Sequence, residues 1–121
     1  GVWVEQQLKR GNDIILEIDW QGAQQVKRLL PQTRAIFILP PSREALQQRL
    51  KLRGQDDPGI IETRMNLAVE EMSHYVESDY LVVNRDFDQA PDELQSIVNS
   101  QRLLTVRQQE VLSDMLQDLL N

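Results

Sequence analysis

The sequence predicts an α/β fold in which a parallel sheet is flanked by helices. The first observation is a set of three short apolar runs, bounded by turn residues, at 14–18, 35–39 and 80–84. Runs that are apolar on both faces are typical of strands buried in parallel sheets. The second observation is that segments of helical periodicity separate these runs, which predicts right-handed helical crossovers between the strands.

Turn residues place the first two helices. Residues 1–10 predict a short helix that ends at Gly11, because glycine is the usual residue just after a helix C-terminus. Residues 23–30 then fit helical spacing, and Pro31 closes that helix because proline cannot continue it. The sequence therefore predicts a helix, a strand and a second helix before the second strand begins.

Capping residues place two further helices before the last strand. Ser42 is a good N-cap for the first of them, which runs to about Arg53 and ends at Gly54. Asp57, followed by Pro58 at the first helical position, starts the second. The inner face of this second helix is predicted from apolar residues at offsets of four, three and four: Ile61, Met65, Ala68 and Met72.

The C-terminal segment from residue 88 onward reads as helical. A break is expected near Thr105, where Thr105 and Gln108 fit a capping box. We therefore expect helices in succession here, and no further strand.

Composition and charge exclude several classes of protein. The 121 residues, 40% hydrophobic and 26% charged, are typical of one globular domain. The absence of cysteine excludes disulfide scaffolds and thiol nucleophiles, and the single histidine, His74, excludes multi-histidine metal sites and reads as structural. A net charge of -6 argues against a nucleic-acid partner. No apolar run approaches the roughly 20 residues that span a bilayer, so we expect a cytoplasmic protein with no membrane partner.

Two acids, Glu17 and Asp19, stand at the carboxyl end of the first predicted strand. Ligands of open parallel sheets bind beyond the carboxyl ends of the strands. Nucleotide-binding folds use an acid in this place near magnesium and phosphates. The alternative is that Asp19 only caps the next helix, since aspartate is a common N-cap. The residues alone leave both readings open.

Three arginines surround a polar loop that contains two glycines. Arg49 and Arg53 are four apart and share one helix face, and Arg64 lies on the following helix. Because guanidinium groups bind phosphate oxygens in bidentate fashion, this arrangement predicts a lid that closes over phosphates. The alternative is a solvated surface on which the arginines pair with acids such as Glu62.

The phosphate-cradling motif G-x-x-x-x-G-K-[ST] does not occur in the 121 residues. The five glycines cannot build it from where they stand: Gly1, Gly11, Gly22, Gly54 and Gly59. No segment of this sequence therefore supplies such a loop.

Several segments resemble those of bacterial guanylate kinases, in the same order along the chain. They are ILEIDWQGA at 15–23, FILPPS at 37–42, RLKLRG at 49–54, RM at 64–65, YLVVN at 80–84 and DFD at 86–88. The set is specific, and the resemblance covers nearly the whole chain. It implies the parallel sheet of a P-loop nucleoside monophosphate kinase, truncated at its N-terminus. Residues 1–47 and 76–121 would form the core, and residues 48–75 the lid-like helices and loop.

The resemblance implies ATP-dependent phosphorylation of GMP to GDP with Mg²⁺. It implies substrate binding by four residues of the first strand end: Glu17, where the family often has Asp, then Asp19, Gln21 and Gly22. Asp19 would also approach the magnesium ion through water. Phosphate binding and catalysis would fall to Arg49, Arg53 and Arg64. Asn84 would line the adenine side of ATP.

The resemblance also sets expectations for the chain by itself. The family's phosphate loop would precede Gly1, so we expect a C-terminal fragment with no measurable kinase activity of its own. The strand that carries that loop lies between strands matching 14–18 and 35–39, and its loss predicts open edges that re-pair, through a homodimer or a swap. The alternative function is a non-catalytic guanylate-kinase-like module that binds proteins. The arginines favour the enzyme, because a binding module needs no phosphate clamp.

Overall fold

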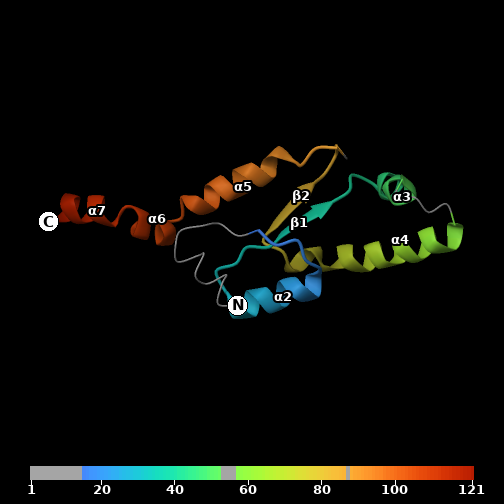
Figure 1. Cartoon of the computed structure of the whole chain (residues 1–121), viewed down its shortest axis with the longest axis horizontal. Helices are drawn as coiled ribbons and strands as arrows, with labels where there is room; N and C mark the ends of the chain where they lie inside the picture. Colours follow the sequence, from blue (N-terminus) through green and yellow to red (C-terminus); the bar gives the residue numbers. More distant parts are fainter. Residues whose placement is uncertain (1–14, 53–56, 87) are drawn as a thin grey trace. The chain divides into compact units, whose positions relative to one another are not determined.

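A computed structural model describes residues 15–52, 57–86 and 88–121 of the chain (Figure 1). The chain divides into two compact units, one formed by Ile18–Leu94 and the other by the residues on either side of it. The first unit contains α2 (Trp20–Leu29), β1 (Ile36–Leu39), α3 (Arg43–Leu52), α4 (Pro58–Met72), the 3-10 helix η1 (Ser73–Glu77) and β2 (Tyr80–Val83). Helix α5 (Asp92–Arg102) begins at the end of this unit.

Strands β1 and β2 pair in parallel and run side by side in Figure 1. Their register pairs Ile36 with Tyr80, Phe37 with Leu81, Ile38 with Val82 and Leu39 with Val83. The chain between them passes through α3, α4 and η1, so the two strands and their helical connection form a β-α-β unit. The expectation of a parallel α/β fold is confirmed.

A polar contact fixes the register at the start of the two strands. The Ala35 N–H donates to Oδ2 of Asp79 at 2.8 Å, and the Ala35 carbonyl accepts from the N–H groups of Asp79 and Tyr80 at 2.9 and 3.0 Å. Lys27 of α2 donates to the same carboxylate at 3.1 Å. One acid therefore joins α2, the start of β1 and the start of β2.

The Asp79 contacts predict a loss of stability in acid. Partial burial raises the pKa of Asp79, but hydrogen bonds from Ala35 and Lys27 outweigh it, so the pKa lies below the ordinary 3.8. The stabilisation is therefore present above pH 3.8 and is lost as the pH falls through the lower folded value. In urea denaturation followed by circular dichroism, Asp79→Asn should lower the midpoint at neutral pH, and the deficit should shrink as the pH falls below the ordinary value and through the folded value.

The control for this experiment is Asp118→Asn, which changes an exposed acid in α7, outside the unit that contains Asp79. Its urea midpoint should follow that of the parent chain at both pH values. An Asp79→Asn deficit of equal size at neutral and acid pH would mean that the carboxylate charge contributes nothing to stability.

Three capping residues start the helices of this unit. Asp19 accepts from the Gly22 N–H at 2.8 Å, Ser42 accepts from the Ala45 N–H at 3.0 Å, and Asp57 accepts from the Gly59 N–H at 2.9 Å. The predicted N-caps at Ser42 and Asp57 are confirmed. Helix α2 starts at Trp20, three residues before the predicted start, because the Asp19 side chain already caps it there.

The strand predicted at 14–18 is wrong for the residues that the structure describes, since residue 14 lies outside them. Residues 15–18 are irregular and exposed: Ile15 is 78% exposed, Leu16 51% and Ile18 48%. An apolar run becomes a strand only when a neighbouring strand takes up its hydrogen bonds. The sheet in the described part of the chain consists of β1 and β2, which offer this run no ladder.

The C-terminal segment is helical, as expected, with α6 (Thr105–Val111) and α7 (Ser113–Leu120) after α5. The break near Thr105 is confirmed, but the capping box is wrong. Leu104 occupies the N-cap, and no side chain caps this helix, because Thr105 is already the first helical residue. The predicted helix at 1–10 lies outside the described residues.

Burial is sparse in the part of the chain that the structure describes. The most buried side chains are Ile61 of α4, 7% exposed, and Val82 of β2, 5% exposed. The predicted inner face of α4 is confirmed, since Ile61 is buried and Met65, Ala68 and Met72 are half-buried. No helix among the described residues is long and apolar enough to cross a membrane.

Candidate functional site

The Asp19–Gly22 turn forms the N-terminus of α2. Oδ1 of Asp19 accepts from the Gly22 N–H, so the helix-capping interpretation of Asp19 is confirmed. The other carboxylate oxygen makes no hydrogen bond to the described residues and remains available to a ligand. A Cβ at position 22 would lie 3.2 Å from Oδ1 of Asp19 and 3.3 Å from Cβ of Ile18, so a larger residue here would crowd the capping carboxylate. Gln21 is exposed beside it.

Trp20 attaches this turn to the end of α4. The backbone N–H of Trp20 donates to Oε1 of Glu71 at 3.0 Å. Its indole ring stacks on the imidazole of His74, with ring centroids 3.6 Å apart and planes 9° apart. Two contacts with different residues hold the first residue of α2 in place.

The imidazole of His74 lies between two glutamates. It bonds to Oε2 of Glu77 through Nδ1, and its Nε2 lies 3.4 Å from Oε1 of Glu70. Desolvation lowers the pKa of His74, but the hydrogen bonds and negative charges of Glu77 and Glu70 outweigh it, so the pKa is raised above 6.5. The hydrogen bonds with His74 and Gln24 lower the pKa of Glu77 and outweigh the opposing effect of burial, so this pKa lies below its ordinary value. The structural role expected for His74 fits these contacts.

Arg49 and Asn84 come together at the carboxyl end of the sheet. Nη2 of Arg49 donates to the Asn84 carbonyl at 2.8 Å. The Asn84 side-chain amide faces the carbonyls of Asp86 and Gln89, an arrangement in which its nitrogen donates to both. Two residues predicted on the ATP side therefore meet just beyond β2, where ligands of parallel sheets bind.

Arg64 lies on the inward side of α4. It belongs to the half-buried stripe of Ile61, Met65 and Ala68 rather than to the exposed positions beside it. It forms no salt bridge with Glu62, and no hydrogen bond or ion pair to the described residues. This half-buried position is compatible with phosphate binding by Arg64, which stays a prediction beside its solvated-face alternative.

Two predicted site residues take no part in these contacts. Glu17 is exposed and irregular, and it makes no hydrogen bond to the described residues. Arg53 lies outside the described residues. The structure thus pairs Asp19 with Gly22 and Arg49 with Asn84, whereas Arg64 lies half-buried on α4 without a partner among the described residues.

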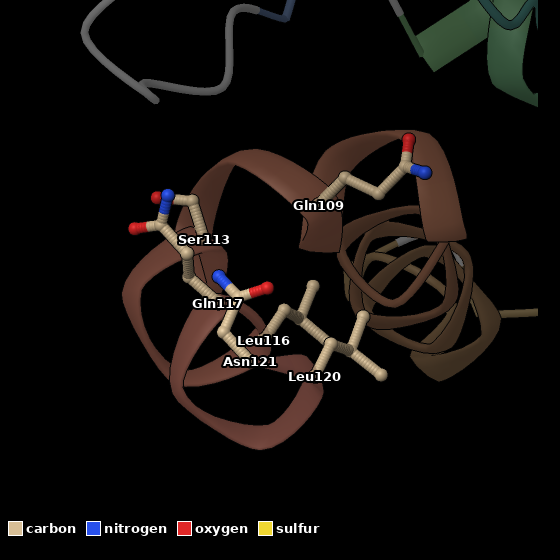
Figure 2. A pocket seen from close by; sticks show the side chains of 6 residues that line it. All are labelled: Gln109, Ser113, Leu116, Gln117, Leu120 and Asn121. Carbon is tan, nitrogen blue, oxygen red and sulfur yellow. The ribbon is translucent and has the colours of Figure 1, made fainter.

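Each of the two units has a surface hollow among its described residues. One runs along α6 and α7, where Figure 2 shows Leu116 and Leu120 next to each other between polar side chains. The other lies between α3 and α4 and is lined by charged and apolar residues that include Arg43, Lys51 and Ile61. Among the described residues that line these hollows, none is a predicted site residue.

Comparison with known proteins decides the family. A family profile described as guanylate kinase matches residues 2–101. The chain belongs to the guanylate kinase family. A curated protein from Saccharophagus degradans, named guanylate kinase, is 55% identical to this chain over 98% of the chain and 58% of that protein. Proteins of the same name from Hahella chejuensis and Coxiella burnetii share 59% and 56%, over 88% and 97% of this chain and 51% and 57% of theirs. The chain therefore spans between about half and three fifths of the length of these relatives.

Guanylate kinases act on nucleotides and use a metal ion, and the Asp19 carboxylate fits a metal held through water. The described residues contain no cluster of three or more metal-ligating side chains. Magnesium needs no such cluster at a phosphate site, because it keeps several waters and takes the rest of its ligands from one or two carboxylates and the phosphates. The free oxygen of Asp19 is such a donor.

Sequence reasoning missed the stack between Trp20 and His74 and the bond from Trp20 to Glu71. The second contact joins residues 51 positions apart, and no local pattern in the sequence links them. The only local signal was that Trp20 follows Asp19 directly, so whatever holds Trp20 also holds the acid.

Proposed function

We propose that the whole protein transfers the γ-phosphoryl group of ATP to GMP, giving ADP and GDP. A phosphate oxygen of GMP forms the new bond to the γ-phosphorus, and the bond from that phosphorus to the β–γ bridging oxygen breaks. The observation that carries the proposal is Arg64, a guanidinium on the inward stripe of a helix, without a partner among the described residues. Family membership supplies the reaction class.

The residues divide into a GMP side and an ATP side. Asp19 and Gly22, with Gln21 and Glu17, would bind GMP, and the free oxygen of Asp19 would orient a water on Mg²⁺. Bound Mg²⁺ would supply positive charge against the phosphates. On the ATP side Asn84 would line the adenine, and three arginines would hold the phosphates: Arg49, Arg53 and Arg64.

The arginines act mainly through charge. Phosphoryl transfer spreads negative charge over the equatorial oxygens, so fixed cations aimed at them lower the barrier. We assign residues 48–75 to the lid that brings Arg53 and Arg64 over the phosphates, and residues 1–47 and 76–121 to the core. The homodimer expected through open strand edges stays a prediction.

The experiment is an ADP-release assay on the whole protein with ATP, Mg²⁺ and one of GMP, AMP or UMP. We expect turnover that depends on GMP and on Mg²⁺, with much lower rates for the other two monophosphates. A preference for AMP or UMP would overturn the substrate. An absence of turnover, together with retained folding, would favour the non-catalytic binding module instead.

A further inference from the structure

One face of α2 contacts a single continuous segment of the chain. Trp20, Gln24 and Lys27 stand at helical spacing on this face. Trp20 contacts Glu71 and His74, Gln24 donates to Glu77, and Lys27 pairs with Asp79. Each step along α2 thus meets a later residue of the segment that runs from the end of α4 through η1 to β2. Figure 1 shows the first turn of α2 next to this end of α4.

The contacts at Trp20 differ from the others because they act on the first turn of α2. The N–H groups of a first helical turn have no partner within the helix. Here the backbone N–H of Trp20 donates to the Glu71 carboxylate, and the indole ring stacks on the imidazole of His74. A bond to the backbone and a stack on the ring together fix both the position and the rotation of the turn that carries Asp19.

Helix α4, from whose end this segment begins, carries Arg64 about two helical turns before Glu71. The turn that carries Asp19 and the helix that carries Arg64 are therefore joined through Trp20. His74 contacts all three elements at this place: Glu70 of α4, Glu77 of η1 and the Trp20 indole of α2. It is therefore suited to hold the first turn of α2 against the end of α4. An imidazolium against an indole face adds a cation–π attraction to the stack.

We propose that His74 is a positioning residue, which acts through its stack on Trp20 to hold the Asp19–Gly22 turn in the geometry that binds GMP. The kinetic part of this proposal rests on the proposed function. The stack itself does not, and it is tested separately by spectroscopy.

The spectroscopic test uses the 121-residue chain, in which His74 is the only histidine. The imidazole proton resonance of His74 can therefore be identified directly, because no other histidine contributes a signal. The ring current of Trp20 should move this resonance upfield, and Trp20→Leu should return it to the position of a free histidine. Its titration midpoint should lie above 6.5, since Glu70 and Glu77 favour the imidazolium. An unshifted resonance in the parent chain would overturn the stack whatever the activity of the protein.

The kinetic test uses the whole protein with variants at both rings. His74→Leu should raise KM for GMP by about 10-fold and leave KM for ATP within about twofold, because only the GMP side loses its geometry. His74→Phe keeps an aromatic ring against Trp20 and should recover most of the loss. The matched control is Val76→Ala, an exposed position 71% accessible on the same 3-10 helix, which should change neither KM.

A purely structural role predicts a different result. Partial unfolding would lower the concentration of active enzyme and hence the apparent kcat, with both KM values unchanged. The double variant Trp20→Leu with His74→Leu adds a second criterion, since two residues that act through each other give a combined effect no larger than either alone. Independent, multiplying effects, or an unchanged KM for GMP in His74→Leu, would overturn the proposal. If His74→Leu fails to fold, Trp20→Phe with His74→Phe repeats the comparison with both rings kept.

Discussion

Replacing Arg64 with alanine in the whole protein is expected to lower kcat by a factor of about 10²–10⁴, with little change in stability. The guanidinium would lose its place against the charge that develops on the transferring phosphoryl group. Arg64 sits on the half-buried stripe of α4 without a partner among the described residues, so its removal breaks no salt bridge to any of them. The measurement is steady-state ADP release at saturating GMP and ATP, with the urea midpoint measured in parallel.

Two further variants separate charge from packing at this position. Arg64→Met keeps an unbranched chain that can fill the same half-buried space but removes the charge, so it should lose as much activity as the alanine variant. Arg28→Ala removes an exposed arginine from the last turn of α2 and should leave kcat unchanged. If the methionine variant retained normal turnover, the Arg64 side chain would serve packing alone.

The elements that the sequence predicted well are those with local causes. Ser42 and Asp57 cap α3 and α4 because each side chain reaches an N–H two or three residues later. The inner face of α4 follows from the spacing of Ile61 and its neighbours, which the helix itself imposes. The family also follows from the order of short segments, and the profile match over residues 2–101 confirms it.

The prediction of a strand at 14–18 failed because a strand depends on a distant partner. The run at 14–18 has the composition of a buried strand, yet its residues 15–18 find no ladder among the described residues. The Thr105 capping box failed for a local reason that spacing does not reveal, because Leu104 takes the N-cap and shifts the register of the helix by one. The pairs at the site, such as Arg49 with Asn84, join residues 35 positions apart. Spacing along the chain does not report on such contacts.

The double role of Asp19 permits a sharper experiment, since it caps α2 with one oxygen and leaves the other for the substrate side. Asp19→Asn keeps a good N-cap, because asparagine accepts the Gly22 N–H as aspartate does, but it removes the charge. Its stability should therefore stay within a few tenths of a kcal/mol of the parent protein, whereas Asp19→Ala should lose about 1 kcal/mol. Both variants should lose kcat by a factor of at least about 100 in the whole protein, because both lack the carboxylate near the phosphates.

The control for cap loss alone is Ser42→Ala, which removes the side-chain cap of α3 without changing the charge. It should lose about as much stability as Asp19→Ala, on the order of 1 kcal/mol, and far less activity. Comparison of the three variants assigns each effect to its cause, since stability follows the cap and turnover follows the carboxylate. Normal turnover in Asp19→Asn would leave Asp19 with its capping role only, and the acid nearest the phosphates would then have to come from elsewhere in the whole protein.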